Sequence, residues 1–371
     1  MNVGVLKEDF KKEGRVALIP AIVKALVSRG HSVFVESEAG IKSRFQDEDY
    51  IKEGARIVYS NDEIFGRSDV VLKVAPPTLE EYQKMKEGQI VFSAFNLAIA
   101  RPEAIKILLN KHITAIGYEI IQDDNGTLPI LLPMSEIAGQ MSILSASQYL
   151  QSNYEGRGVL LGGVAGVPPA MVVILGAGVA GTCAARTAIG LGAQVVILDR
   201  DINRLRRISE IFQRRVVTSV SNGYNIEKAV KFADVLIGAV LVPGQRAPVL
   251  VKREMVREMR PKTIIVDISI DQGGCVETSH PMTIYDPPYL EENVLHYSVP
   301  NMPAMVSRTA TYALSNAFLS YLLQIVELGI ERALHENHAL FRGVYTYKGF
   351  LVNKNLSEGF HLPFRSLQSI L

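Results

Sequence analysis

The sequence predicts an α/β protein with two parallel sheets, each covered by helices and each belonging to its own domain. Short apolar runs alternate with amphipathic segments of helical period along most of the chain, which is typical of strands joined by right-handed helical crossovers. The 371 residues are more than one such domain usually contains. With 48% apolar and 21% charged residues, the composition is that of a globular protein with buried cores.

The first third of the chain contains one series of expected strands. Helical patterns lie between them, for example over residues 21–28 and 79–86. Because strands and helices alternate, we expect a parallel sheet. The expected strands cover residues 2–6, 32–36, 69–74, 89–92 and 114–117.

A second series follows in the middle of the chain. Its helical patterns include residues 181–191 and 225–232. The expected strands cover residues 171–175, 194–198, 215–217, 234–239 and 263–268.

Two long helical segments flank the second series. One is expected to begin at Ser135, a good N-cap residue, with Glu136 in the first turn where the helix dipole favours an anion, and to run to residue 149. The other is expected over residues 308–333. Such a pair can carry the chain out of one domain and back into it. We therefore predict a discontinuous first domain, 1–135 plus 308–371, with a second domain, 136–307, inserted between.

A glycine-rich turn opens the inserted domain. Residues 176–181 read G-A-G-V-A-G, directly after an apolar strand and before a helix. In this pattern Gly176 makes a tight turn, Gly178 lets the backbone approach a pyrophosphate, and Gly181 lets the helix pack on the strand. A purely structural turn is the alternative, but the strand, the spacing and a following acidic residue favour a dinucleotide site. We predict two Rossmann-like doubly wound domains, the inserted one binding NAD through Gly176, Gly178, Val179 and Gly181.

Asp199 ends the next expected strand and bears on the choice of cofactor. A carboxylate there can accept both ribose hydroxyls of the adenosine and repels a 2′-phosphate, which favours NAD over NADP. Arg204 is close enough in sequence to contact the same site. Arg200, Arg206 and Arg207 also follow. These arginines could offset the repulsion, or they could form the solvated start of a helix, which is the interpretation favoured for the last two.

The composition excludes several other classes of function. Lys and Arg total 39 against 38 Asp and Glu, so no overall basic charge attracts nucleic acid or an anionic membrane. The uncharged segment 158–185 contains Pro168-Pro169 and many glycines, so it is not a membrane helix. Two cysteines and no signal peptide indicate a cytoplasmic protein. His335 and His338 have no recognisable ligand partners, so no metal site is predicted.

Seven segments together resemble the alanine dehydrogenases and, more distantly, the transhydrogenase alpha subunit. This resemblance covers essentially the whole chain. It implies an NAD-dependent, reversible oxidative deamination of L-alanine to pyruvate and ammonium by a homo-oligomer, a hexamer in many members, with a dimer as the alternative. The first domain would then bind the substrate. The segments are GRVALIP around Arg15, LPMSEIAGQM at 132–141, GGVAGVPPA at 162–170, the glycine-rich turn at 176–181 with LDRD at 198–201, IGAVLVPGQRAP at 237–248, VDISIDQGG at 266–274 and VPNMPAMVSRTATYAL at 299–314.

The resemblance also implies roles for individual residues. Arg15 would hold the substrate carboxylate, for which a planar two-point donor is suited; a surface salt bridge is the alternative. Asp271 would lie near the nicotinamide and the amine, where a carboxylate can stabilise ammonium or handle protons. The residues that would line the dinucleotide are Ser135, Ser221, Val240, Leu241, Ile268, Asn301 and Met302.

Two catalytic side chains of the family are absent. The family's K-V-K-E-P segment reads K-V-A-P-P here, so that Ala75 replaces the lysine that polarises the substrate carbonyl. Its L-H-L-A segment reads F-N-L-A, so that Asn96 replaces the acid–base histidine. In a strand, Lys73 would project from the same face as residue 75 and could compensate; a structural role for it is equally weighted. His296 is expected to be hydrogen-bonded scaffold rather than a replacement.

Three hypotheses follow from these departures. The first is an amino-acid dehydrogenase with weakened alanine activity, or with a pocket enlarged at Ala75 for a bulkier 2-oxo acid or an imine. The second is a non-catalytic NAD-binding protein that regulates assembly or a partner. The third is a transhydrogenase subunit, which the missing membrane-spanning extension and the segment at 299–314 disfavour. We favour the first.

Overall fold

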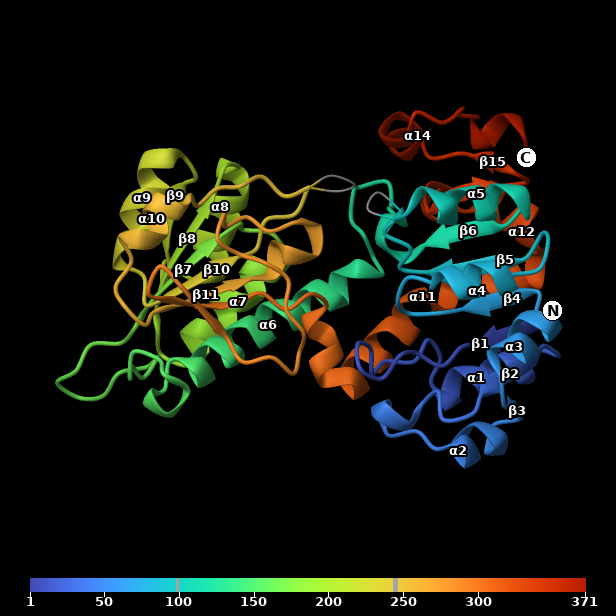
Figure 1. The fold of residues 1–371 in the computed structure, drawn as a ribbon, viewed down its shortest axis with the longest axis horizontal. Coiled ribbons are helices and arrows are strands. Elements are labelled where there is room, and N and C mark those ends of the chain that lie inside the picture. The colour runs from blue at the N-terminus through green and yellow to red at the C-terminus, as the bar shows by residue number, and fades with distance from the viewer. Residues whose placement is uncertain (98–99, 243–245) are drawn as a thin grey trace. The chain divides into compact units, whose positions relative to one another are not determined.

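The computed structural model describes residues 1–97, 100–242 and 246–371, and the chain divides into two compact units (Figure 1). Unit 1 comprises Met1–Met134 and Ala304–Leu371, and unit 2 comprises Ser135–Pro303. Each unit is built around its own mostly parallel sheet, so the predicted α/β class is confirmed.

The sheet of unit 1 has the strand order β3-β2-β1-β4-β5-β6-β14-β15. The first six of these strands are parallel, and β14 and β15 are antiparallel additions at one edge. The chain winds in opposite directions from β1, so the carboxyl ends of β1 and β4 border the switch point where such sheets bind ligands. The strands are β1 (Asn2–Val5), β2 (Ser32–Glu36), β3 (Arg56–Val58), β4 (Val70–Leu72), β5 (Ile90–Ser93), β6 (Thr114–Gly117), β14 (Val344–Tyr347) and β15 (Phe350–Leu351).

Helices cover both faces of this sheet. Residues of α3, α4 and α5 form one core with the strands, around Phe65, Tyr82 and Leu108. On the other face, Phe92 of β5 stacks on Phe318 of α11 with ring centroids 6.3 Å apart, and Figure 1 shows α11 behind the sheet. The helices are α1 (Pro20–Val27), α2 (Asp47–Lys52), α3 (Asn61–Arg67), α4 (Leu79–Lys84), α5 (Pro102–Asn110), α11 (Ser307–Leu328), α12 (Ile330–Glu336), α13 (His338–Arg342) and α14 (Lys354–Phe360).

Unit 2 repeats the same winding with the order β9-β8-β7-β10-β11-β13-β12. Among the described strands of unit 2, only β12 is antiparallel to its neighbour, β13. The glycine-rich turn follows β7, at the switch point next to β10. The elements are β7 (Met171–Leu175), β8 (Gln194–Asp199), β9 (Val217–Val220), β10 (Val235–Gly238), β11 (Ile264–Asp267), β12 (Tyr289–Glu291), β13 (Val294–Tyr297), α6 (Leu131–Tyr149), α7 (Val179–Gly190), α8 (Ile202–Ile211), α9 (Gly223–Phe232) and α10 (Arg253–Arg257).

The predicted helix start at Ser135 is wrong. Helix α6 begins at Leu131, and Ser135 lies within it. Pro133 is in the first turn, where backbone N–H groups have no partner within the helix, so the missing N–H of proline carries no penalty. The proline therefore permits the earlier start.

Other predicted elements also differ in extent, three of them as follows. The helix predicted over 308–333 is interrupted, because Gly329 has a φ of 78° and separates α11 from α12. The strand predicted over 215–217 is shifted to Val217–Val220, after a turn in which Gln213 and Arg214 have positive φ. The strand predicted over 69–74 ends at Leu72. Short strands such as β3 and the antiparallel β12, β14 and β15 were not predicted, because two to four residues carry too little periodicity.

Among the described residues, none of the helices combines the length and apolarity needed to cross a membrane.

Candidate functional site

The turn between β7 and α7 contains the three glycines of the motif. A β-carbon at Gly176, whose φ is 106°, would lie 2.3 Å from the carbonyl oxygen of Ala239. At Gly181 it would lie 1.8 Å from the carbonyl oxygen of Gly176. Gly178 differs, because no heavy atom lies within 4 Å of its would-be β-carbon. The fold requires the outer two glycines, whereas the middle one borders space that a ligand can occupy.

Helix α7 offers its N-terminus to that space. It begins at Val179, two residues earlier than predicted, with Gly178 as the N-cap and no side chain capping it. Exposed backbone N–H groups and the positive end of the helix dipole suit a phosphate. The residues present therefore fit the pyrophosphate of a dinucleotide.

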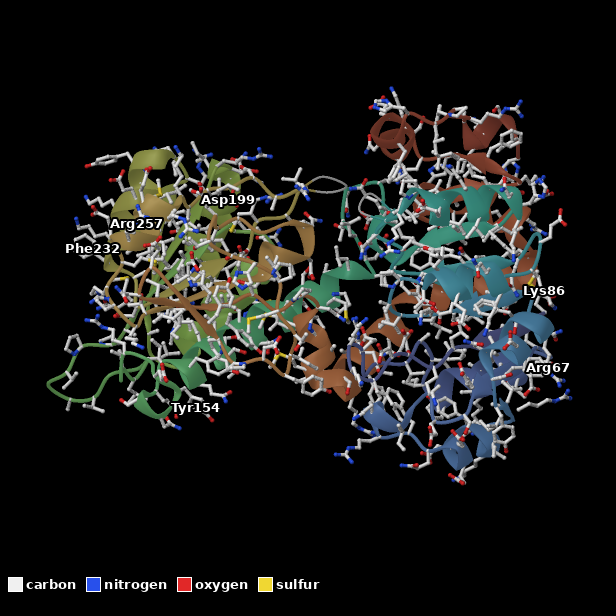
Figure 2. All side chains as sticks on the ribbon, in the orientation of Figure 1. Arg67, Lys86, Tyr154, Asp199, Phe232 and Arg257 are labelled. Atoms are coloured by element: carbon white, nitrogen blue, oxygen red, sulfur yellow. The ribbon has the colours of Figure 1, made fainter. Side chains whose placement is uncertain are left out.

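Asp199 ends β8 and is bonded to the same turn. Its buried carboxylate accepts hydrogen bonds from the N–H of Ala177 at 2.7 Å and of Asp201 at 2.8 Å. The guanidinium of Arg204 lies 3.9 Å from the same carboxylate, and Figure 2 labels Asp199 on the unit 2 sheet. Each oxygen of the Asp199 carboxylate has a second lone pair, so the carboxylate can still accept hydrogen bonds from ribose hydroxyls.

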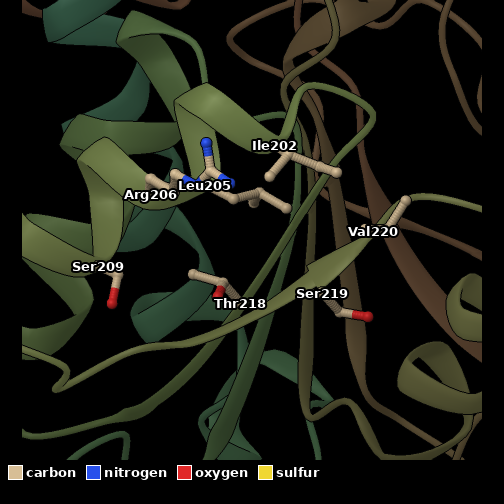
Figure 3. Close-up of a pocket in the computed structure, with 7 residues that line it drawn as sticks. All are labelled: Ile202, Leu205, Arg206, Ser209, Thr218, Ser219 and Val220. Carbon is tan, nitrogen blue, oxygen red and sulfur yellow. The ribbon is translucent and has the colours of Figure 1, made fainter.

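A shallow hollow of about 330 Å³ lies beside this region, between α8 and the edge strand β9 (Figure 3). None of the predicted cofactor residues lines it. Its lining residues are Ile202, Leu205, Arg206, Ser209, Thr218, Ser219 and Val220.

Asp271 and Asn301 are brought together although they are far apart in sequence. Asp271 lies in a 3₁₀ turn (Ile268–Gln272) after β11, and its Oδ1 accepts a hydrogen bond from the N–H of Asn301 at 2.8 Å. Asn301 has a left-handed φ of 58°, a conformation that asparagine tolerates well. The contact joins two of the motifs on which the family resemblance depends.

The other predicted dinucleotide residues lie at the carboxyl edge of the unit 2 sheet or in α6. The N–H of Val240 donates to Oγ of Ser269 at 2.9 Å, and the N–H of Ser221 donates to the carbonyl of Asp199 at 3.0 Å. Leu241 is exposed and Met302 is buried. Ile268 begins the turn that carries Asp271, and Ser135 lies in α6. Residues 243–245 of the motif at 237–248 lie outside the described residues.

Arg15 lies in the loop after β1, on the switch-point side of the unit 1 sheet. Its guanidinium forms a two-point ion pair with Glu13, with Nε to Oε1 at 2.8 Å and Nη2 to Oε2 at 2.6 Å. Nη1 lies 3.1 Å from the sulfur of Met134. Both charged side chains are almost fully buried, so Arg15 is no surface salt bridge. A planar guanidinium is a group suited to a carboxylate.

Lys73 is held between two buried carboxylates. Its Nζ lies 2.9 Å from Glu8 and 3.1 Å from Glu81. Burial acts to lower the pKa of Lys73, but the two carboxylates outweigh it and raise the pKa. Burial likewise raises the pKa of Glu8 to about 7, against the lowering effect of Lys73. With two carboxylates and one lysine, this cluster can take up a proton near neutral pH while the lysine stays charged.

That Lys73 and Ala75 project from one face stays a prediction. Strand β4 ends at Leu72, but hydrogen bonds to the β5 segment continue, because the N–H of Lys73 donates to the carbonyl of Phe92 at 2.9 Å and the N–H of Ala94 donates to the carbonyl of Val74 at 3.2 Å. Because both ion pairs fix the ammonium group, its position is determined by Glu8 and Glu81 rather than by strand alternation.

Asn96 follows β5 in a left-handed conformation with a φ of 46°. Its N–H donates to Oε1 of Glu119 at 2.6 Å, and the Tyr345 hydroxyl donates to the same oxygen at 2.9 Å. Burial raises the pKa of Glu119. The side chain of Asn96 cannot titrate, but the Glu119 carboxyl that bonds to its backbone N–H can.

His296 is part of the scaffold of unit 2, as predicted. It is fully buried, its Nε2 lies 2.7 Å from Oγ1 of Thr278, and its Nδ1 lies 2.9 Å from the carbonyl oxygen of Val294. Burial lowers the pKa of His296 to about 4. In the described part of the chain no group of three His, Cys, Asp or Glu side chains could hold a metal ion.

Four acidic residues near these sites were missed in the sequence analysis: Glu8, Glu13, Glu81 and Glu119. Glu8 and Glu119 each closely follow a strand, and the carboxyl ends of parallel strands converge at one edge. Their position after a strand was the signal that could have identified them in the sequence. No sequence signal identified Glu13 and Glu81, since their partners become apparent only in three dimensions.

Comparisons with known proteins agree across the whole chain. Residues 4–138 match the family model "Alanine dehydrogenase/PNT, N-terminal domain", and residues 142–354 match "Alanine dehydrogenase/PNT, C-terminal domain". An alanine dehydrogenase of Methanococcus maripaludis is 46% identical over 100% of both chains. A solved L-alanine dehydrogenase structure is 46% identical, with a TM-score of 0.92 over 97% of this chain and 99% of that one. The transhydrogenase structure from Sinorhizobium meliloti is 26% identical, with a TM-score of 0.80 over 95% of this chain and 99% of the other.

Proposed function

The chain belongs to the alanine dehydrogenase/PNT family, and we propose that it is an NAD-dependent dehydrogenase of a small L-amino acid. The reaction converts the amino acid, NAD⁺ and water into the 2-oxo acid, ammonium, NADH and a proton, and it is reversible. The observation that carries the proposal is the buried Arg15 at the switch point of the unit 1 sheet, held in a fixed plane by Glu13. Such a group is suited to an α-carboxylate.

The dinucleotide would be held by the glycine-rich turn, the N-terminus of α7 and Asp199. When bound, it accepts or supplies the hydride. Gly178 leaves room for the pyrophosphate, and Asp199 would accept the ribose hydroxyls, supported by its place at the end of β8. The negative charge of Asp199 favours NAD over NADP. Arg204 is the group that would weaken that preference.

The remaining chemistry of the reaction consists of proton transfers to and from the carbinolamine. Asp271 would stabilise the ammonium group or exchange protons with it. Ala75 and Asn96 stand where the resemblance implies a lysine and a histidine, and neither can titrate. Positioned acid–base groups contribute about 10²–10⁴-fold to such steps, so we propose weak activity with alanine or a shifted substrate. A bulkier 2-oxo acid would fit the space at Ala75, and a preformed imine would need fewer proton transfers.

The assembly belongs to the same proposal. Family resemblance supports a homo-oligomer, a hexamer or a dimer. The alternative function, a dinucleotide-binding protein without turnover, is favoured by one observation: Ala75 and Asn96, where the resemblance implies a lysine and a histidine, have no ionisable side chain.

One assay separates the two functions. NADH and ammonia are supplied with a panel of 2-oxo acids, and cyclic imines are supplied with NADH alone, while the nicotinamide absorbance is followed. A parallel series with NADPH tests the cofactor preference. Turnover of at least one substrate with NADH is expected. Tight NADH binding without turnover across the panel would reject the dehydrogenase and favour the binding protein.

A further inference from the structure

Two buried polar groups at the carboxyl edge of the unit 1 sheet lack hydrogen-bond partners among the described residues. They are the hydroxyl of Tyr118 and Oε2 of Glu119, neighbours in the 3₁₀ turn Tyr118–Ile120 that follows β6. A buried polar group without a partner costs about 1–3 kcal/mol, so a native protein usually retains one for a reason other than stability. The edge concerned is the one where ligands bind in this kind of sheet.

The two groups point into different surroundings. Glu119 already accepts two hydrogen bonds through Oε1, from Asn96 and Tyr345. Tyr118 is only 4% exposed, and none of the described residues forms a hydrogen bond with its hydroxyl. Its ring is fixed, with centroid distances of 5.8 Å to Phe92 and 5.4 Å to Phe318. The ring therefore has a definite position, and its hydroxyl has no hydrogen-bond partner within residues 1–97, 100–242 and 246–371.

Helix α11 places this ring beside the segment that carries Arg15. Thr311 Oγ1 accepts from the N–H of Val16 at 3.1 Å, and Ser315 Oγ donates to the carbonyl of Ala17 at 2.8 Å. Phe318, whose ring contacts that of Tyr118, follows on the same helix face, because residues i, i+4 and i+7 of a helix align. Burial raises the pKa of Tyr118, and the charges that act on its hydroxyl are those of Glu8, Arg15 and Glu119. The hydroxyl thus stays protonated, and its ring packs on the same helix that holds the segment next to Arg15.

We propose that the Tyr118 hydroxyl is a substrate-binding group that donates a hydrogen bond to the 2-oxo oxygen of the acid whose carboxylate Arg15 holds. This inference rests on the proposed function. The side chain of Ala75 has no hydrogen-bond donor, so Tyr118 would supply the hydrogen bond to the 2-oxo oxygen. Tyr118 acts by hydrogen bonding alone, so no proton leaves it. The ligand class is a 2-oxo acid, in which the oxo oxygen lies one carbon from the carboxylate.

The test compares two carboxylates that differ only at the oxo group. Pyruvate and propionate are titrated into the NADH-loaded protein without ammonium, and binding is measured by calorimetry or by the shift in Tm. The wild type is expected to bind pyruvate more tightly than propionate. Tyr118→Phe is expected to weaken pyruvate binding about tenfold, roughly the effect of one lost hydrogen bond, and to leave propionate binding unchanged.

Tyr347→Phe is the matched control. Tyr347 is also buried. It ends β14, which pairs antiparallel with β6, so it lies near the amino end of β6, whereas Tyr118 follows the carboxyl end. Its hydroxyl donates to Glu331 at 3.3 Å. This variant should lose stability and keep the preference for pyruvate. Tyr118→Phe should be at least as stable as the wild type, because it removes an unpaired buried hydroxyl. The Tm of both variants verifies that unit 1, which carries the two tyrosines, is folded.

Three results would overturn the proposal: equal binding of the two acids by the wild type, an equal loss for both acids in Tyr118→Phe, or an unchanged preference in that variant. These results are independent of turnover. If the protein prefers pyruvate through Tyr118 but converts no substrate, the role of Tyr118 is supported and the proposed dehydrogenase function is rejected.

Discussion

Glu13 and Arg15 form a buried ion pair in which both carboxylate oxygens face the guanidinium, at 2.8 Å and 2.6 Å. The two residues are neighbours in the loop after β1, and their side chains are 1% and 8% exposed, respectively. Arginine would be costly at such a depth without a partner. The pair therefore keeps a positive planar group at the switch point before any substrate arrives.

Replacing Arg15 by lysine should separate carboxylate binding from dinucleotide binding. Lysine retains the charge but loses the planar two-point geometry. Because charge-assisted hydrogen bonds contribute about 1.5–3 kcal/mol, KM for the 2-oxo acid should rise about 10–100-fold, while the Kd for NADH stays unchanged. Arg29→Lys, in a half-exposed pair with Glu327, is the control. An unaltered KM in Arg15→Lys would remove this residue from the substrate site.

Two glycines of the same turn should respond differently to alanine. Gly178→Ala places a methyl group in open space at a φ of −74°, so the fold should persist while the Kd for NADH rises at least about tenfold. Gly181→Ala places it 1.8 Å from the carbonyl of Gly176 and should lower Tm as well. NADH fluorescence titrations and thermal unfolding measure the two effects. Wild-type NADH affinity in Gly178→Ala would mean that the pyrophosphate binds elsewhere.

Lys73 is expected to be structural, through its ion pairs with Glu8 and Glu81. Lys73→Met leaves two buried carboxylates without their cation and should cost about 3–5 kcal/mol in the free energy of unfolding. Lys348→Met removes an exposed pair with Glu331 and should cost less than about 1 kcal/mol. Denaturant unfolding compares the two variants. A stable Lys73→Met that has lost only activity would instead indicate a catalytic lysine.

Glu8 should make the stability of unit 1 depend on pH. Its pKa is raised from 4.5 to about 7 in the folded protein, so the folded state binds the proton more tightly than the unfolded state. The resulting stabilisation is fully present below pH 4.5 and is lost as the pH rises to about 7, with a change of up to about 3 kcal/mol.

The difference in unfolding free energy between wild type and Glu8→Gln isolates this contribution. It should fall over that pH interval, whereas the difference between wild type and Glu38→Gln, an exposed residue paired with Lys7, should stay nearly constant. A flat profile for both variants would show that Glu8 keeps an ordinary pKa.

The double variant Ala75→Lys with Asn96→His tests whether these two positions limit activity with alanine. If they alone limit alanine chemistry, pyruvate amination should rise at least about tenfold, which is about 1.4 kcal/mol in the barrier. The two single variants are the controls, and initial rates with saturating NADH and ammonia are the measurement. No gain in the double variant would mean that the pocket differs at further positions.

Local sequence patterns predicted much of the fold because they reflect local physics. The strand over 171–175, the turn after it and the acidic end of β8 are each specified within a few residues by apolar runs and glycine geometry. Predictions were wrong where a local signal competed with another. Ser135 resembles a cap, yet Pro133 permits an earlier helix start, and Gly329 divides a helix whose apolar period continues past it.

By itself, the sequence determined the α/β class, the dinucleotide turn and the presence of Arg15, Ala75 and Asn96, since each depends on residue identity or on short-range pattern. Only the tertiary structure decided what surrounds them. Lys73 joins Glu8, which is 65 positions away, and Tyr118 and the segment next to Arg15 both pack on α11. Such partners are selected when strands from distant parts of the chain end at one sheet edge, where burial makes every charge and hydroxyl depend on its neighbours.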